Sequence, residues 1–254
     1  MEEAPVMDIR HMKLAYGERV LAADISFHIE EGECVLLAGA NGCGKSTLLR
    51  LLASWARWDF MGPTKPNGNG SDSVTTHNEW ARKVAQNPTW PKCILIPTGI
   101  PKVKGFTVEE FIRTGCYRES NWAGKLSGEM EKRLTDALER LGLNGQRRQD
   151  ISTLSDGEFQ KACIAVGLAR KADILLLDEP TAYLDVENRL MVLNTLRRLA
   201  DQTGIAVLFS SHDLSDALKV AHRVLAFTPD RRFLESTTKN RPEVLQAAFP
   251  MYEP

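Results

Sequence analysis

The chain has 254 residues, of which 43% are hydrophobic and 26% are charged, a composition that excludes a disordered or fibrous chain. Its length predicts one large α/β domain or two small ones. Its 32 Lys and Arg against 33 Asp and Glu leave a net charge of −1, and because so balanced a chain has no long-range field to hold a polyanion, we expect no nucleic acid as a partner.

The chain also lacks the marks of a membrane-spanning or secreted protein. Its longest apolar runs, such as 174–177, fall far short of the roughly 20 residues that a membrane helix needs. The first five residues carry acids where a signal peptide would carry basic residues. The five cysteines are scattered and form no CxxC pair, which suits a reducing compartment. We therefore expect a cytoplasmic location and free thiols.

The first thirty residues are predicted to form sheet, because Ile25, Phe27 and Ile29 alternate with polar residues. The next strand, at 34–38, is wholly apolar, as expected for a strand that is buried on both faces of a parallel sheet. Three later apolar runs repeat this pattern, at 94–96, 174–177 and 205–209. The segments between them are long enough to hold crossover helices. The prediction is an α/β fold with a mostly parallel sheet.

Two segments depart from this alternation. Residues 62–78 are rich in Gly, Pro, Asn, Ser and Thr, so we predict a flexible surface loop there. Between residues 96 and 174 we predict a helical insertion, because apolar residues follow helical spacing on one face before Gly142, which is placed to end the helix. These apolar residues are Met130, Leu134, Ala137, Leu138 and Leu141.

Residues 39–46 read GANGCGKS and fit the phosphate-loop pattern GxxxxGK[ST], between a buried strand and a segment of helix formers. In this motif, glycines let backbone N–H groups face phosphate oxygens, Lys45 adds a positive charge at the β and γ phosphates, and Ser46 coordinates Mg²⁺. A nucleoside triphosphate with Mg²⁺ is therefore the predicted ligand, and we expect Cys43 to be a small filler in the loop. The candidate binding residues are Gly39, Asn41, Gly42, Cys43, Gly44, Lys45, Ser46 and Thr47.

Asp178 and Glu179 come directly after the apolar run 174–177, at the strand end where open α/β sheets bind ligands. We expect Asp178 to hold the magnesium ion, usually through water. We expect Glu179 to polarise the attacking water, a role worth roughly 10²- to 10⁴-fold in rate. The two acids and the phosphate loop together predict hydrolysis of the triphosphate.

Four motifs stand in the order found in ABC-type ATPases: the phosphate loop at 39–46, LSDGE at 154–158, DEPTAYLD at 178–185 and SSHD at 210–213. The chain resembles that family over roughly residues 7–227, and a GTPase would need a guanine-reading NKxD element, which we do not find. The resemblance implies that the nucleotide is ATP, and that the fold is a RecA-like P-loop NTPase core with an N-terminal antiparallel β region. It places the core at 1–98 and 166–254, and a helical subdomain that carries the LSDGE signature at 99–165.

The resemblance also assigns roles by position. Tyr16 matches the aromatic residue that stacks on adenine, and His212 matches the switch histidine that senses the γ-phosphate. Asp185 matches the acid that couples the two active sites of a head-to-tail dimer. In such a dimer, Ser155 and Gly157 contact the ATP that the other chain holds.

The signature departs from the usual LSGGQ, because Asp156 and Glu158 add acids to a helix N-terminus that should receive phosphate. Ser155 and Glu158, however, have the spacing of a capping box, in which the glutamate turns back to its own helix. We expect that arrangement here. A similar short motif at 126–129 is interpreted as a decoy, with Ser127 as a plain N-cap.

A second departure concerns the glutamine that in this family links magnesium to the transport partner. Counting back from the helix start predicted at 107–110 puts Thr98 in that place, after the strand at 94–96. Gln86 also lies at a familiar distance from Lys45, but before that strand. We favour Thr98 as the metal ligand, which would replace an amide oxygen by a hydroxyl.

The resemblance implies an ATP-hydrolysing transporter subunit, a homodimer peripheral on the inner face of the membrane. Its partners would be a membrane permease on another chain and an external substrate-binding protein. Residues 105–111 and 178–185 most resemble importers of ferric siderophores, haem and cobalamin. One alternative is a soluble ABC-type ATPase that remodels a cytosolic assembly, although the sequence has no second cassette, coiled-coil insertion or basic linker. Another is a low-turnover, nucleotide-dependent interaction module, suggested by the altered signature.

Overall fold

The structure is a computed structural model that describes residues 4–55, 74–75, 90–116, 127–237 and 240–251. A six-stranded sheet lies at its centre, in the order β5-β6-β7-β3-β8-β9. All neighbouring strands run parallel except the edge strand β9, which pairs antiparallel with β8. The predicted mostly parallel α/β sheet is thereby confirmed. Its strands are β3 (Cys34–Ala38), β5 (Cys93–Ile96), β6 (Ile174–Leu177), β7 (Ala206–Ser210), β8 (Arg223–Phe227) and β9 (Phe233–Glu235).

A second, antiparallel sheet is built from the N-terminal residues, as predicted. Its strands β1 (Met7–Tyr16) and β2 (Arg19–Ile29) form a hairpin, and the short strand β4 (Val74–Thr75) pairs with the end of β1. β4 falls inside the segment 62–78, for which a flexible loop is predicted. The rest of that segment lies outside the described residues.

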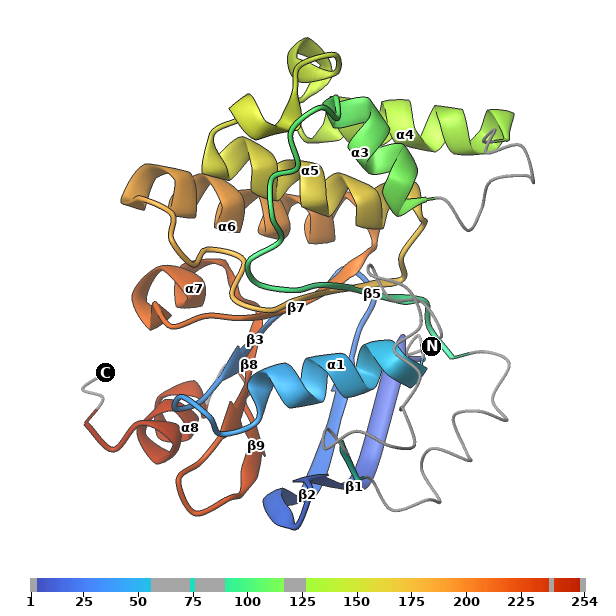
Figure 1. The fold of residues 1–254 in the computed structure, drawn as a ribbon. Coiled ribbons are helices and arrows are strands. Elements are labelled where there is room, and N and C mark those ends of the chain that lie inside the picture. Colours follow the sequence, from blue (N-terminus) through green and yellow to red (C-terminus); the bar gives the residue numbers. More distant parts are fainter. Residues whose placement is uncertain (1–3, 56–73, 76–89, 117–126, 238–239, 252–254) are drawn as a thin grey trace.

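Helices cover both faces of the central sheet (Figure 1). The helix α1 and the β1–β2 hairpin lie on one face, while α5 and α6 lie on the other, with α3 and α4 outside them. Each strand contributes side chains to the hydrophobic cores on both faces of the sheet, because successive side chains point to opposite faces. In β3, Val35 and Leu37 pack toward α1, and Leu36 and Ala38 pack toward the opposite layer. The helices are α1 (Lys45–Trp55), α3 (Val108–Gly115), α4 (Gly128–Arg140), α5 (Asp156–Ala169), α6 (Val186–Thr203), α7 (Leu214–Val220) and α8 (Arg241–Ala248), with 3-10 turns at Asn144–Gln146 and Ile151–Thr153.

The helix α4 shows how local sequence sets an element. Ser127 is its N-cap and accepts a hydrogen bond from the backbone N–H of Met130 at 3.2 Å, as expected for the decoy motif. Its buried face carries the predicted apolar residues, and Gly142 follows the helix end at a φ of 67°, where glycine is favoured. The predicted helix is confirmed.

The proposed division of the chain stays a prediction. α3 and α4 fall inside the predicted helical subdomain at 99–165, but α5 runs as one helix across its boundary at residue 165. Within the described ranges, every helix is too short or too polar to cross a lipid bilayer.

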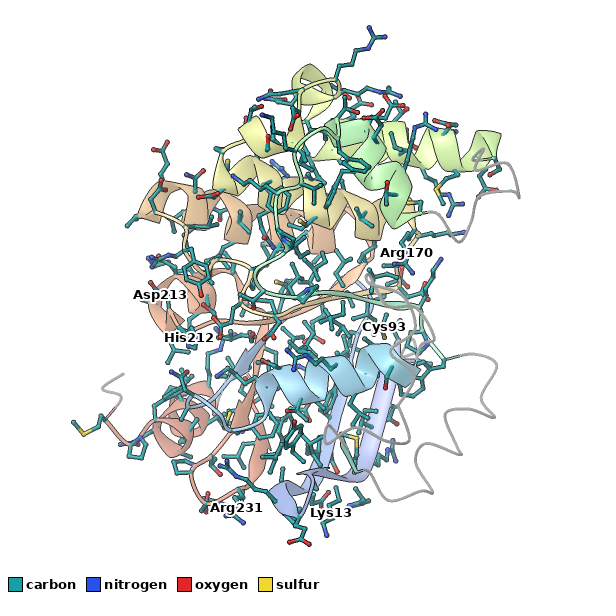
Figure 2. All side chains as sticks on the ribbon, viewed as in Figure 1. Lys13, Cys93, Arg170, His212, Asp213 and Arg231 are labelled. Atoms are coloured by element: carbon teal, nitrogen blue, oxygen red, sulfur yellow. The ribbon has the colours of Figure 1, made fainter. Side chains whose placement is uncertain are left out.

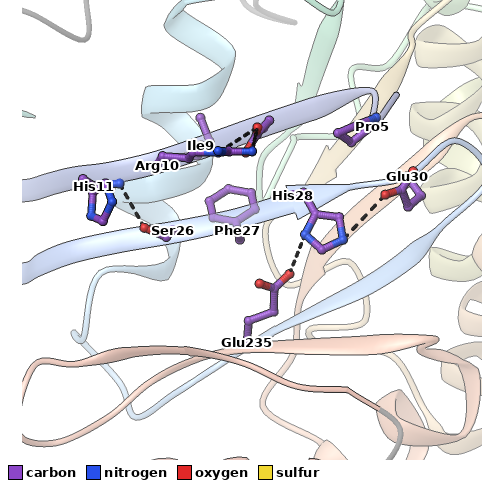
Figure 3. A pocket seen from close by; sticks show the side chains of 10 residues that line it. Pro5, Ile9, Arg10, His11, Ser26, Phe27, His28, Glu30 and Glu235 are labelled. Atoms are coloured by element: carbon purple, nitrogen blue, oxygen red, sulfur yellow. Dashed lines mark hydrogen bonds and ion pairs between the residues drawn. The ribbon is translucent and has the colours of Figure 1, made fainter. Parts of the chain in front are cut away.

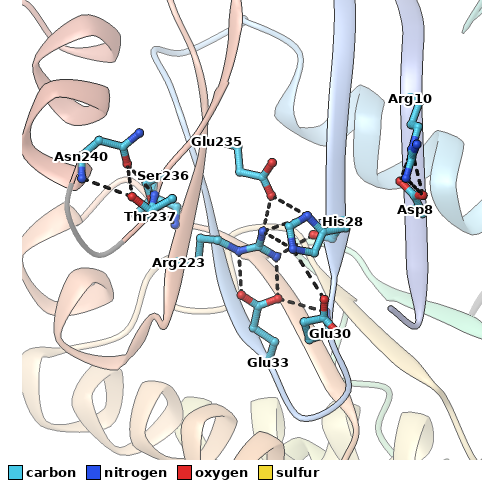
Figure 4. Close-up of polar contacts among 11 residues, drawn as sticks. Asp8, Arg10, His28, Glu30, Glu33, Arg223, Glu235, Ser236, Thr237 and Asn240 are labelled. Carbon is cyan, nitrogen blue, oxygen red and sulfur yellow. Dashed lines mark hydrogen bonds and ion pairs between the residues drawn. The ribbon is translucent and has the colours of Figure 1, made fainter. Parts of the chain in front are cut away.

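An arginine joins the C-terminal strands to the N-terminal hairpin (Figure 4). Arg223, on β8, donates to both carboxylate oxygens of Glu33 at 2.6 and 2.7 Å and to the backbone carbonyl of His28 at 2.6 Å. It also pairs with Glu235 on β9. Because these groups are largely withdrawn from water, the ion pairs hold the edge of the central sheet against β2.

Candidate active site

The carboxyl ends of four parallel strands meet at one edge of the central sheet. Leu177 of β6 lies opposite Ile96 of β5 on one side and Phe209 of β7 on the other, and Leu37 of β3 lies opposite Ser210. Residues that follow these strands are therefore neighbours although they are far apart in the sequence. This register brings the phosphate loop together with Thr98, Asp178, Glu179 and the segment 210–212.

The phosphate loop requires glycine at three of its positions. Gly39, Gly42 and Gly44 have φ values of 143°, 70° and 124°, which L side chains rarely adopt. A methyl group on Gly39 would also lie 2.8 Å from the sulfur of Cys43 and 3.0 Å from Phe227. Burial raises the pKa of the Cys43 thiol, which agrees with a packing role in the loop. The result is a backbone cradle with room for phosphate oxygens.

Lys45 is the first residue of α1, and its ammonium lies inside this cradle. The side chain is largely buried, and Nζ donates to the backbone carbonyls of Gly39 at 2.7 Å and Ala40 at 3.2 Å. The positive end of the α1 dipole points at the same place. Loop amides, helix dipole and ammonium together form a site for a polyanion, with Asn41 exposed in the loop and Thr47 in the first turn of α1.

Asp178 is held by hydroxyl groups. One of its carboxylate oxygens accepts from Ser46 at 2.9 Å and from Ser210 at 3.1 Å, while the Thr98 hydroxyl donates to its backbone carbonyl. Carboxylate and hydroxyl oxygens suit Mg²⁺. In the part of the chain that the structure describes, no three His, Cys, Asp or Glu residues gather to hold a metal ion. A magnesium ion here would therefore complete its shell with phosphate oxygens and water, as this ion usually does.

Glu179 has a left-handed backbone, with a φ of 51°, a conformation that costs a non-glycine residue roughly 1–2 kcal/mol. Its N–H donates to the Ser210 hydroxyl at 2.9 Å, and its carboxylate accepts from the backbone N–H of His212 at 3.1 Å and lies 3.2 Å from Nε2 of that ring. Figure 2 shows His212 beside α7. Burial raises the pKa of Glu179, although His212 and Lys45 act in the opposite direction. A carboxylate so held is suited to polarise a water molecule.

Ser210 was not among the predicted site residues, yet it contacts both acids. It is fully buried at the end of β7. In the sequence, Ser210 is only the first polar residue after an apolar run. In the fold, that run lies beside the strand that precedes Asp178 and Glu179. That neighbourhood depends on strand order, which the sequence does not contain.

Tyr16 ends β1 and is partly exposed. The hairpin packs closely against the phosphate loop. Its closeness is seen at Gly44, where an added methyl group would lie 3.2 Å from Leu21 and 3.6 Å from Leu14 of the hairpin. Tyr16 lies two residues beyond Leu14 on the same strand. The predicted adenine-stacking residue is thus placed on the hairpin that supports the loop.

The predicted capping box is present at the start of α5. Ser155 accepts from the backbone N–H of Glu158 at 3.2 Å, and the Glu158 carboxylate accepts from the N–H and hydroxyl of Ser155 at 3.0 and 2.9 Å. Gln146 donates to the other oxygen of this carboxylate at 3.1 Å. These bonds lower the pKa of Glu158. The acid is therefore folded back onto its own helix, as expected.

Gly157 and Asp185 are linked through one asparagine. A methyl group on Gly157 would lie 2.4 Å from the side-chain oxygen of Asn188, and Asp185, the N-cap of α6, accepts from the backbone and side-chain nitrogens of Asn188 at 2.8 and 2.9 Å. α5 and α6 lie on the sheet face opposite α1. The structure thus joins Gly157 to Asp185 on one face, while Lys45 begins the helix on the other.

Thr98 and Gln86 are the two candidates for the metal-linking position. The structure places Thr98 on Asp178, as described above. Gln86 lies outside the described residues.

A separate groove of about 760 Å³ lies on the outer face of the β1–β2 hairpin (Figure 3). Its charged side chains are paired with one another: Arg10 with Asp8 at 2.9 Å, and His28 with Glu235 at 3.2 Å and Glu30 at 3.6 Å. Since three carboxylates, Asp8, Glu30 and Glu235, line this groove beside the single guanidinium of Arg10, the groove offers no site for a polyanion comparable with the phosphate loop.

Comparison with known proteins points to one family. The sequence profile described as ABC transporter matches residues 22–182. The iron(3+)-hydroxamate import ATP-binding protein FhuC of Bacillus subtilis is 31% identical, over 96% of this chain and 87% of its own length. The ferric enterobactin transport ATP-binding protein FepC of Escherichia coli is 32% identical, over 85% of this chain and 75% of its own. An aliphatic sulfonates import ATP-binding protein, SsuB 2 of Burkholderia lata, is 33% identical, over 89% and 74%.

Solved structures share the fold. A chain of an inward-facing ABC transporter superimposes with a TM-score of 0.71 at 24% identity, over 95% of this chain and 90% of that one. The cbiO1 protein of Clostridium perfringens, part of the cbiONQ ABC transporter complex, gives 0.69 at 19% identity, over 98% and 97%.

Proposed function

The chain belongs to the ABC transporter family, as an ATP-binding subunit that couples ATP hydrolysis to transport, and from this premise we propose how its residues divide the work. The observation that carries the proposal is the meeting of Lys45, Ser46, Asp178 and Glu179 at one sheet edge, with His212 on Glu179. The loop amides and Lys45 bind the triphosphate. Glu179 orients the water that attacks the γ-phosphate, and His212 holds Glu179 and senses that phosphate.

Mg²⁺ belongs to this proposal as the counter-charge of the phosphates. Ser46 and Asp178 would hold it, the latter usually through water, with Thr98 next to them at the backbone carbonyl of Asp178. When bound, the ion neutralises charge that develops on the phosphate oxygens. Tyr16 stacks on the adenine ring from the hairpin that supports the loop.

The signature supports a dimer as the working form. Ser155 and Gly157 lie on the sheet face opposite α1. In the proposed head-to-tail homodimer, these two residues contact the ATP that the partner chain holds. Asp185 couples the two ATP sites. The dimer is proposed to lie at the inner face of the membrane, against a permease on another chain, with an external substrate-binding protein in the same system.

The proposed cargo is an iron–siderophore complex or a related chelate such as haem or cobalamin. Relatives such as FhuC and FepC are named for hydroxamate and enterobactin iron transport. A sulfonate importer subunit matches at similar identity, so an organic sulfonate is the second candidate. Co-purification of the permease with this chain, followed by uptake of ferric hydroxamate or an alkanesulfonate into vesicles, separates the two.

Phosphate release by the purified chain, measured beside the Glu179→Gln variant, tests hydrolysis. We expect the variant to lose about 10²-fold or more in rate and to persist as an ATP-bound dimer in gel filtration. Equal rates would remove the enzymatic role and favour the low-turnover module. A variant that stays monomeric with ATP would contradict the proposed dimer.

A further inference from the structure

The acid at the third position of the signature, Asp156, takes no part in the capping box of Ser155 and Glu158. Asp156 is in the first turn of α5, and its side chain is 65% exposed. A carboxylate at this place repels an anion that approaches the helix N-terminus. Since the proposed function requires the signature to receive a phosphate, the charge of Asp156 has to be compensated.

Lys102 supplies that compensation from a different segment. It lies in the loop between β5 and α3, and its ammonium is 2.7 Å from the Asp156 carboxylate. The same ammonium donates to the backbone carbonyl of Leu154 at 2.7 Å and lies 5.6 Å from the centre of the Phe159 ring. One cation thus contacts Leu154 and Asp156 within the signature and lies over Phe159 directly after it, and only a quarter of the Lys102 side chain is exposed.

The loop that carries Lys102 is also attached to the active site. Thr98, four residues earlier, donates to the backbone carbonyl of Asp178. The segment 98–102 is therefore held at one end by the acid-bearing strand end and at the other end by the signature. The two attachments are on one short stretch of chain.

We propose that Lys102 is a positioning residue for the signature: it cancels the charge of Asp156 and fixes the turn around Leu154, so that α5 can receive phosphate from the partner's ATP. This inference rests on the proposed function. The contacts of Lys102 described above are with the signature and Phe159, not with the phosphate loop. Loss of Lys102 should therefore spare ATP binding to the phosphate loop and impair the steps that need the signature.

The experiment is a charge swap, with Lys102→Glu, Asp156→Lys and the double variant compared with the wild type. Binding of a fluorescent ATP analogue should stay within about twofold in all of them, because the phosphate loop is unchanged. The kcat for phosphate release should fall about tenfold or more in Lys102→Glu, a loss typical of removing electrostatic support from a phosphate-binding group. The double variant should recover most of it. Lys104→Glu, an exposed change of the same charge in the same loop, is the matched control and should leave kcat unchanged.

A merely structural role is separated by a second pair of variants. Lys102→Ala should lower kcat more when Asp156 is present than in the Asp156→Asn background, where only the bond to the Leu154 carbonyl is lost, and thermal unfolding is followed in parallel. Wild-type turnover in Lys102→Glu, or a double variant as impaired as that single variant, overturns the inference. A wild-type chain that releases no phosphate would instead refute the proposed function.

Discussion

The phosphate-loop edge and the signature end of this molecule hold their charges in different ways. At the edge, Lys45 and Asp178 are each only 6% exposed, and their partners come from neighbouring strand ends. At the signature, Asp156 is exposed and paired with a lysine from a distant loop, and Glu158 is turned back by its own helix cap. Buried charges need fixed partners, because an unpaired buried charge is costly, whereas exposed charges can be managed by local caps and single ion pairs.

The contrast teaches how one chain can carry two phosphate-contacting regions with opposite requirements. Within the edge, the phosphate loop favours an anion, since it gathers loop amides, an ammonium and a helix N-terminus. The signature carries extra acids and must remove their charge from the helix end. Variants that alter one region should therefore leave the other's function intact.

The largest effect is expected at the edge. Lys45→Ala removes the ammonium from the phosphate cradle, and loss of a buried charged partner of this kind costs about 2–5 kcal/mol, or roughly 30- to 4,000-fold in affinity. Titration with a fluorescent ATP analogue measures it. Lys102→Ala is the comparison and should bind the nucleotide as the wild type does. Similar losses in the two variants would erase the distinction between the regions.

The second prediction concerns the ionisation of Glu179, which should set the acid limb of the pH–rate profile. Glu179 must be ionised to polarise water, and burial raises its pKa above the ordinary 4.5. The rate of phosphate release should therefore fall as the pH decreases through that raised pKa. Below it, the rate should fall about tenfold per pH unit. Removing the imidazole with His212→Ala should shift the limb to higher pH, since His212 lowers this pKa. Phosphate release measured from pH 4.5 upward follows the limb. An unchanged limb in Glu179→Gln would exclude Glu179 as its source.

Close packing around Gly157 of the signature predicts an effect on the free energy of unfolding. Gly157→Ala places a methyl group 2.4 Å from Asn188 and 2.7 Å from Met191, and such overpacking typically costs about 1–3 kcal/mol of unfolding free energy. Gly128→Ala, in the first turn of α4 with open space around it, is the control and should be neutral or slightly stabilising. Urea denaturation compares the two. Equal midpoints would show that α5 can move away from α6 at no cost.

The smallest effect concerns the ion pairs of Glu109, which join it to Arg113 within α3 and to Arg147 in the segment beyond α4. Arg147 and Arg113 lower the pKa of Glu109 to about 2, and both pair with it at 2.6 Å. Glu109→Gln should cost about 1 kcal/mol at pH 7, since solvent screens these groups. The stabilisation by a depressed carboxylate pKa is present above pH 4.5 and is lost as pH falls toward 2. The difference in unfolding free energy between the variant and the wild type, measured by denaturant titration, should therefore be smaller at pH 3. A difference that does not change with pH would contradict an electrostatic origin.

Much of the fold could be predicted because it depends on short-range patterns. The apolar runs marked the buried strands, alternation marked β2, and the spacing of Ser155 and Glu158 announced the capping box. β8, β9 and α8 were not predicted. β9 lies at the sheet edge with its side chains only partly buried, so its sequence lacks a clear period.

The sequence by itself determined which residues form the phosphate loop, the paired acids and the helix caps, because each of these depends on neighbours a few positions away. The tertiary structure alone decided that Ser210 joins Asp178 and Glu179 and that Lys102 meets Asp156. Those contacts arise from the order of the strands in the sheet and from the path of the loop between β5 and α3. Residues far apart in the chain become partners only when the sheet is assembled, and no local pattern records that assembly.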